Sequence, residues 1–278
     1  MQPRADDHAT AYSRCMSDIR PSNATASSSI GTDDLRVERT GAVLTVSVNR
    51  PAKKNAFTGG MYTALADALE TLDADDTLRC LVVRAAGDCF CAGNDLNDFL
   101  TLDTLAPDTP VVRVLTALGR GEKPLLAAVN GAAIGIGTTL LLHCDLVFAT
   151  PDARFGVPFV PLGLVPEAAS SRLLVELIGY RRAMAMFLLG EQLDAEAAIA
   201  AGLVNRCVPH AVLDETVMAA AARIAALPAE AVRQTRRLCR AEPVSIAATI
   251  ERENARFAER LACPETRAAI QAVLGARR

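Results

Sequence analysis

Residues 123–137 read Lys-Pro-Leu-Leu-Ala-Ala-Val-Asn-Gly-Ala-Ala-Ile-Gly-Ile-Gly, and they carry the strongest indication of the fold. The apolar run 125–129, introduced by a proline, predicts a short buried strand. The glycines that follow predict a turn into a helix that runs to about His143. A strand that enters a helix through glycines leaves backbone N–H groups free at the helix N-terminus, where they favour a developing negative charge. A simple tight turn is the alternative interpretation of these glycines.

Phosphate-binding loops are not predicted. The chain contains no GxxxxGK[ST] motif, and Gly131, Gly135 and Gly137 do not form a GxGxxG pattern. Two free N–H groups that point at one carbonyl oxygen would instead form an oxyanion hole.

Other apolar segments surround this stretch and extend the prediction. Strand-like segments occur at 35–48, in two pieces around Gly41, and again at 79–85 and 145–149. A helix is predicted to open at Thr58, because apolar residues recur at helical spacing after it. Helices are also predicted over 111–121 and, after about Glu167, over 168–178, 181–189, 195–201, 213–225, 229–240 and 244–261. Strands interleaved with helices are typical of an α/β fold with a parallel or mixed sheet, here followed by a helical C-terminal region.

The composition argues against several classes of protein. The chain has 278 residues, of which 51% are hydrophobic, and a net charge of −3. It lacks the strong positive charge of a nucleic-acid-binding protein, so a nucleic acid partner is not predicted. No apolar run reaches the roughly 18 residues that would span a membrane. Eight cysteines occur without a CxxC pair, which predicts reduced structural thiols, no metal site and a cytoplasmic location. None of His8, His143 and His210 is predicted to be catalytic, and His143 is expected to be packed or hydrogen-bonded.

Residues 1–31 are predicted to be a disordered tail. They are rich in polar residues and lack the apolar core of a secretory signal. Met16 is a possible alternative start, and the acidic residues Asp6, Asp7 and Asp18 argue against a transit peptide.

A set of short segments occurs in a fixed order along the chain. They read Asn-Arg-Pro-Ala-Lys-Lys-Asn-Ala-Phe (49–57), Phe-Cys-Ala-Gly-Asn-Asp-Leu (90–96), the stretch 123–137, Cys-Asp-Leu-Val-Phe-Ala (144–149), Phe-Gly (155–156), Pro-Leu-Gly-Leu-Val-Pro-Glu (161–167), Leu-Leu-Gly-Glu-Gln-Leu-Asp-Ala-Glu-Ala-Ala (188–198) and Gly-Leu-Val-Asn (202–205). From about residue 35 to 265 this ordered set resembles the crotonase (enoyl-CoA hydratase/isomerase) superfamily. Within that superfamily the pattern is closest to the peroxisomal-type Δ3,Δ2-enoyl-CoA isomerases.

The resemblance implies a fold, an assembly and a substrate. The fold would be the α/β crotonase (ClpP/crotonase-like) fold of repeated ββα units in two roughly perpendicular sheets. Residues 32–210 would form the core, and 211–278 would form a C-terminal helical oligomerisation region of a homotrimer or hexamer. The substrate would be an acyl-CoA thioester, and no cofactor would be needed because coenzyme A is part of the substrate.

The resemblance also implies roles for individual residues. The backbone N–H groups of Asn94 and Ile136 would form the oxyanion hole, which stabilises a thioester enolate. Substrate and CoA contacts are implied for Lys54, Ala56, Ala92, Gly93, Asp95, Leu96, Gly135 and Phe159.

Two departures from the family pattern bear on the reaction. Hydratases of this family use two glutamates, and here the corresponding positions hold Thr139 and Phe159. Neither side chain can activate water as a base near neutral pH. Ordinary two-glutamate hydration is therefore not predicted.

Glu167 is the predicted catalytic carboxylate. It stands in Pro-Glu-Ala-Ala-Ser-Ser (166–171), which resembles the single-glutamate isomerases of this family. Glu167 would remove the C2 proton of a 3-enoyl thioester and return a proton to C4, and an apolar surround with Phe159 and Val160 would raise its pKa. Taken alone, an acidic residue after proline is also typical of a first helical turn.

Two other functions stay open. One is enoyl-CoA hydratase or another reaction of this superfamily, and the other is an acyl-CoA-binding protein without catalysis.

Overall fold

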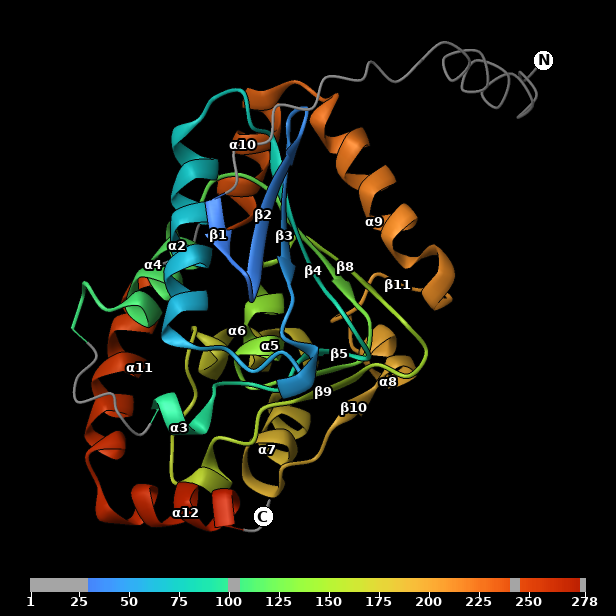
Figure 1. The fold of residues 1–278 in the computed structure, drawn as a ribbon. Helices are drawn as coiled ribbons and strands as arrows, with labels where there is room; N and C mark the ends of the chain where they lie inside the picture. The colour runs from blue at the N-terminus through green and yellow to red at the C-terminus, as the bar shows by residue number, and fades with distance from the viewer. Residues whose placement is uncertain (1–29, 100–105, 241–245, 276–278) are drawn as a thin grey trace.

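The computed structural model describes residues 30–99, 106–240 and 246–275, and β-strands of that part of the chain form two sheets (Figure 1). The long sheet has the spatial order β1 (Ile30–Thr32), β2 (Leu35–Thr40), β3 (Val43–Val48), β4 (Cys80–Ala85), β6 (Leu125–Val129), β8 (Leu146–Ala149) and β11 (Arg206–Cys207). The short sheet has the order β10 (Leu193–Asp194), β9 (Arg154–Gly156), β7 (Ala132–Ile134) and β5 (Cys89–Cys91). The predicted tail lies almost wholly outside the described residues.

The two sheets alternate along the chain. Strands β4, β6 and β8 belong to the long sheet, and each is followed at once by a strand of the short sheet, β5, β7 and β9 respectively. Neighbouring strands of these two sets pair in parallel. A helical segment then leads to the next long strand. This repetition confirms the predicted ββα units, and in Figure 1 the short sheet crosses the lower end of the long one.

Helical segments surround the sheets. The α-helices are α2 (Gly59–Ala74), α3 (Leu96–Phe99), α4 (Pro110–Arg120), α5 (Ile136–Thr139), α6 (Ser170–Ile178), α7 (Tyr180–Leu189), α8 (Ala195–Ala200), α9 (His210–Ala225), α10 (Ala229–Cys239), α11 (Ile246–Leu261) and α12 (Pro264–Gly275). The 3-10 segments are η1 (Pro51–Lys53), η2 (Leu140–His143) and η3 (Val160–Leu162). The single helix predicted to His143 is thus two segments, because the Cys144 N–H bonds to the Leu141 carbonyl and tightens the last turn.

Helix α2 illustrates how the sequence forms these elements. The Thr58 hydroxyl accepts a hydrogen bond from the Met61 N–H at 3.4 Å and caps the helix, as predicted. Met61, Leu65, Leu69 and Leu72 are buried on one face, against the sheet and α4. This stripe therefore fixes the side of the helix that faces the core.

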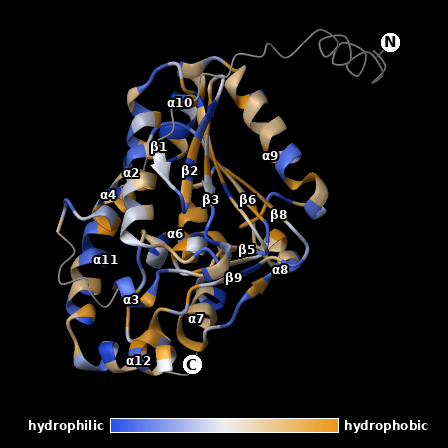
Figure 2. Cartoon of the chain, viewed as in Figure 1, coloured by the Kyte–Doolittle hydropathy of each residue, from blue (hydrophilic) through white to orange (hydrophobic). Residues whose placement is uncertain are grey.

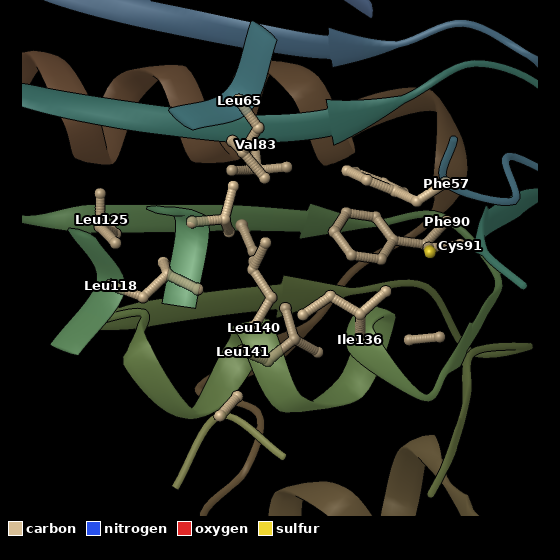
Figure 3. Packing of buried hydrophobic residues seen from close by; sticks show 14 of the residues in the cluster. Phe57, Leu65, Val83, Phe90, Cys91, Leu118, Leu125, Ile136, Leu140 and Leu141 are labelled. Carbon is tan, nitrogen blue, oxygen red and sulfur yellow. The ribbon is translucent and has the colours of Figure 1, made fainter. Parts of the chain in front are cut away.

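The hydrophobic core lies on both faces of the long sheet. The larger part packs between the sheets and helices α2, α4 and α11 (Figure 3), and a smaller part packs between the opposite face and α9. Figure 1 shows α9 on the other side of the sheet from α2 and α4. Figure 2 shows the central strands β6 and β8 in the hydrophobic colour, which agrees with their burial. No helix in the described residues is long and apolar enough to cross a membrane.

One predicted surface residue is part of the core. Helical spacing alone predicts that Arg236 on α10 is solvated or at a subunit contact, but only 6% of it is exposed. Its Nε lies 2.9 Å from both carboxylate oxygens of Asp145, and its guanidinium also donates to the backbone carbonyls of Gly121 and His143. The expectation was wrong because Asp145, directly before β8, and two backbone carbonyls provide partners for the guanidinium that helical spacing alone does not reveal.

Candidate active site

A cavity of about 800 Å³ opens where the short sheet meets the C-terminal helices. Every predicted site residue except Glu167 lines it, namely Lys54, Ala56, Ala92, Gly93, Asn94, Asp95, Leu96, Gly135, Ile136 and Phe159. Segments that are distant in sequence thus meet around one space.

Two glycine-containing loops approach each other at the cavity wall. Gly93 follows β5 with φ +95°, and Gly135 precedes α5 with φ +57°, conformations that L side chains rarely adopt. A Cβ on Gly135 would lie 3.6 Å from the Cα of Gly93. A Cβ on Gly137 would clash with the Cys91 carbonyl oxygen at 2.9 Å. The glycines therefore allow the start of α5 to lie directly against the end of β5.

Each loop presents one backbone N–H that its own secondary structure does not use. In the parallel bridge between Phe57 and Asn94, the Phe57 N–H donates to the Gly93 carbonyl, and the Asp95 N–H donates to the Phe57 carbonyl. The Asn94 N–H takes no part in these bonds. Ile136 is the first residue of α5, so its N–H has no acceptor within the helix. These are the two N–H groups predicted for the oxyanion hole, and they lie on adjacent loops of one cavity.

The side chains of these two residues fix the loops from behind. Ile136 is 1% exposed, and Figure 3 shows it among the core residues Phe90 and Leu140. The Asn94 Oδ1 accepts a short hydrogen bond from the hydroxyl of Tyr62 on α2. Sequence reasoning missed Tyr62, because it lies in the apolar stripe of α2 and looks like an ordinary core residue.

The loop 49–57 is held in place by one buried amide. Asn55 is fully buried with φ +57°, and its Nδ2 donates to the carbonyls of Ala86 and Cys89 at 2.8 and 2.6 Å. Lys54 at the neighbouring position is exposed and pairs with Asp88 at 2.7 Å. The loop thus brings a surface cation to the mouth of the cavity.

Glu167 lies beside the cavity rather than in its lining. It is 3% exposed, and its charge acts on Tyr62 and Cys91, the residues behind Asn94 and Gly93. Burial raises the pKa of Glu167 to about 8, and the negative charge of Glu253 adds to the rise. The Thr139 hydroxyl acts in the opposite direction. Neither Glu167 Oε1 nor Thr139 Oγ1 has a hydrogen-bond partner in the described part of the chain, so the two groups are close without hydrogen-bond geometry.

The backbone after Glu167 is strained. Ala168 and Ala169 have φ of +56° and +58°, and a left-handed conformation costs an alanine roughly 1–2 kcal/mol. Glu167 therefore does not belong to the first turn of α6, which begins at Ser170. Strained non-glycine residues next to a buried carboxyl are frequent at functional sites.

The far part of the cavity is apolar. Phe159, Leu164, Phe257 of α11 and Leu274 of α12 all belong to its lining. Phe159 also packs on Phe187, with ring centroids 6.5 Å apart. Sequence reasoning missed Phe257 and Leu274, because helical apolar stripes do not show which space they face. Val160, predicted next to Glu167, is 40% exposed.

No metal site is visible among the described residues. No group of three or more histidine, cysteine or acidic side chains is arranged to hold an ion there. Cys91, on which the charge of Glu167 acts, is buried, and burial raises the pKa of its thiol to about 12.

Comparison with known proteins agrees with this geometry. The family model for enoyl-CoA hydratase/isomerase matches residues 38–268. The chain is 40% identical to 1,2-epoxyphenylacetyl-CoA isomerase of Escherichia coli over 67% of this chain and 74% of that protein. It is 36% identical to 2,3-dehydroadipyl-CoA hydratase of Escherichia coli over 69% and 76% of the two chains. It is also 36% identical to enoyl-CoA delta isomerase 2 of Rattus norvegicus over 72% and 52%.

Solved structures show the same fold. The structure of OdaA from Pseudomonas aeruginosa is 40% identical, covers 87% of this chain and 99% of its own, and superposes with a TM-score of 0.84. The names of the relatives include isomerases and a hydratase, so the site itself must distinguish these reactions.

Proposed function

The chain belongs to the enoyl-CoA hydratase/isomerase family and is an acyl-CoA enzyme, and from this premise we propose that it is an enoyl-CoA isomerase that converts a 3-enoyl-CoA to the 2-enoyl isomer. One observation supports this choice above others. Glu167, whose charge acts on Tyr62 and Cys91 behind the two loops, is buried and has a raised pKa, whereas the hydratase positions hold Thr139 and Phe159.

The proposed reaction needs one carboxylate and one oxyanion hole. Glu167 takes the C2 proton, which the carbonyl and the alkene both acidify, and the electron pair moves onto the thioester oxygen. The N–H groups of Asn94 and Ile136 stabilise that oxygen, and one such donor is worth on the order of 10²–10³ in rate. The protonated Glu167 then gives its proton to C4, so the double bond moves and no atom is gained or lost. Proton transfer alone accomplishes this, and we propose that no cofactor takes part.

Burial of Glu167 has two consequences for the proposal. Substrate binding has to bring C2 and C4 within reach of a carboxyl that is beside the cavity, and such contacts commonly tighten only in the substrate complex. Because the base must be ionised and its pKa is raised to about 8, kcat/KM should rise with pH and level off above pH 8.

The remaining lining residues fit an acyl-CoA with an uncharged acyl group. We propose that Lys54, an exposed cation of the cavity lining, contacts the CoA phosphates, and that Ala56, Ala92, Asp95 and Leu96 of the same lining contact other parts of CoA. Asp95 is paired with Arg50 at 2.9 Å, so it adds little free negative charge. The apolar end around Phe159 and Phe257 would take the acyl chain.

The test is turnover of a 3-enoyl-CoA against the 2-enoyl isomer, with Glu167→Gln and a matched control. We expect isomerisation by the wild type, loss of at least about 100-fold in Glu167→Gln, and no change in Glu215→Gln, an exposed carboxylate on α9. Hydration of the 2-enoyl substrate would support the hydratase alternative. Tight thioester binding without either activity would support a binding protein.

We also propose that the protein forms a homotrimer or a hexamer of it. Large apolar side chains are exposed on α7, namely Tyr180, Leu188 and Leu189, and Leu238 is exposed on α10. Burial of these side chains between copies would remove them from water. Light scattering should give three or six times the protomer mass, and a monomer would contradict the proposal.

A further inference from the structure

The turn after Glu167 is held from two sides by groups that the proposed reaction does not use. Ala168 and Ala169 are both left-handed, and α6 begins directly after them without a side-chain cap of its own. Something outside this segment must therefore stabilise the turn that carries the carboxyl.

Glu253 of α11 holds one side of the turn. Its two carboxylate oxygens accept hydrogen bonds from the backbone N–H groups of Ala169 and Ser171, the latter at 2.9 Å. Glu253 is only 7% exposed, so these bonds form away from water. A carboxylate that accepts the free N–H groups at a helix start acts as an N-cap, although here it comes from 82 residues further along the chain.

His143 holds the other side. Its Nε2 lies 2.8 Å from the Ala168 carbonyl oxygen, and its Nδ1 lies 3.3 Å from an Arg240 guanidinium nitrogen. A carbonyl only accepts and a guanidinium only donates, so the proton must sit on Nε2 and the ring must be neutral. Burial lowers the pKa of His143 to about 4, which agrees with this assignment.

We propose that Glu253 and His143 are positioning residues, which together clamp the left-handed Ala168–Ala169 turn and hold the Glu167 carboxyl beside Tyr62 and Thr139. This inference rests on the proposed role of Glu167. Neither residue lines the cavity. The clamp joins the carboxyl to α11, the helix whose Phe257 lines the cavity one turn further on.

Two charge effects accompany the clamp. Burial is the main cause of the raised pKa of Glu167, and Glu253 is the charged group that adds to it. The neighbouring Tyr62 and Cys91 are neutral because burial raises the pKa of each. Burial raises the pKa of Glu253, whereas its hydrogen bonds with Ser171 and Ala169 and the positive charge of the exposed Arg252 lower it. Removal of the Glu253 charge should therefore lower the pKa of Glu167 and move the pH profile of kcat/KM to lower pH.

The experiment compares Glu253→Gln, Glu253→Asp and the control Glu251→Gln, an exposed glutamate on the same helix. Glu253→Gln should lower kcat by roughly 10- to 100-fold with little change in KM, because a displacement of the Glu167 carboxyl by about 1 Å costs this much in rate. It should also shift the pH profile of kcat/KM to lower pH. Glu253→Asp keeps the charge but is too short for both N–H groups, so kcat should fall without the shift. Glu251→Gln should match the wild type in both.

His143 gives an independent test if the Glu253 variants do not fold. His143→Gln retains an N–H that can donate to the Ala168 carbonyl, and His143→Leu does not. We expect His143→Gln to retain most of kcat and His143→Leu to lose most of it. Unchanged binding of a saturated acyl-CoA would show that each variant is correctly folded. Equal kcat and pH profiles in the wild type, Glu253→Gln and His143→Leu would overturn the clamp. An active Glu167→Gln would instead overturn the proposed function.

Discussion

Substitution of Glu167 by Gln should abolish catalysis and yet stabilise the protein in alkaline solution. In the folded protein burial raises the pKa of Glu167 from its ordinary 4.5 to about 8. The folded state therefore holds a proton between these values that the unfolded chain releases. Stability linked to this group is fully present below pH 4.5, declines as the pH rises, and is lost above pH 8.

The size of the effect follows from the size of the shift. One pKa unit corresponds to 1.36 kcal/mol. The contribution of Glu167 to the free energy of unfolding should therefore fall by roughly 5 kcal/mol between pH 4.5 and pH 8. About 3 kcal/mol of this decrease should have occurred by pH 7. Gln has nearly the same shape and cannot ionise. Its buried amide has its own desolvation cost, but that cost does not change with pH.

The assay is urea unfolding from pH 5 to pH 9 at a fixed protein concentration. The difference in unfolding free energy between Glu167→Gln and wild type should increase steadily in favour of the variant as the pH rises to 8. All other titrating groups are shared and largely cancel in this difference. Glu215→Gln should run parallel to the wild type. Parallel curves for Glu167→Gln and wild type would refute the assignment of a raised pKa to this carboxyl.

Three further predictions concern the surroundings of the site. Tyr62→Phe removes the hydroxyl that holds the oxyanion loop, and kcat should fall roughly tenfold at unchanged KM, as one lost hydrogen bond would cause. Arg236→Ala removes the buried guanidinium that donates to Asp145 and to the carbonyls of Gly121 and His143, and should cost about 1–3 kcal/mol of stability in a denaturation series. The exposed Arg237→Ala should cost less than about 1 kcal/mol. Phe257→Ala should lower stability by about 3 kcal/mol or more and raise KM for long acyl chains, and an unchanged KM would argue against an acyl subsite at that wall.

Much of the fold could be predicted because long apolar segments have clear periodicity. Helix α2 begins at the predicted Thr58 cap, and strands β3, β4 and β6 occur where β-branched and aliphatic runs predicted them. The short sheet could not be found this way. Strands of two or three residues, such as β5 and β9, are too short for a repeating pattern, and pairing with distant segments makes them strands.

The candidate site was predictable to the extent that it depends on backbone and ordered motifs. Asn94 and Ile136 were chosen by their places in glycine-containing segments, and both line one cavity. The groups behind them were not predictable. Tyr62 and Glu253 contact the site through tertiary packing, and each looks like a routine residue of its helix in the sequence.

The cavity wall formed by Phe257 and Leu274 has a consequence for biosynthesis. A chain grows from its N-terminus, so the strands and both glycine loops leave the ribosome well before α11 and α12. The cavity thus lacks part of its lining until α11 and α12 have been synthesised. A nascent or prematurely terminated polypeptide would have much of the α/β core but no closed acyl-binding space. The cavity can therefore be completed only after α11 and α12 have emerged from the ribosome.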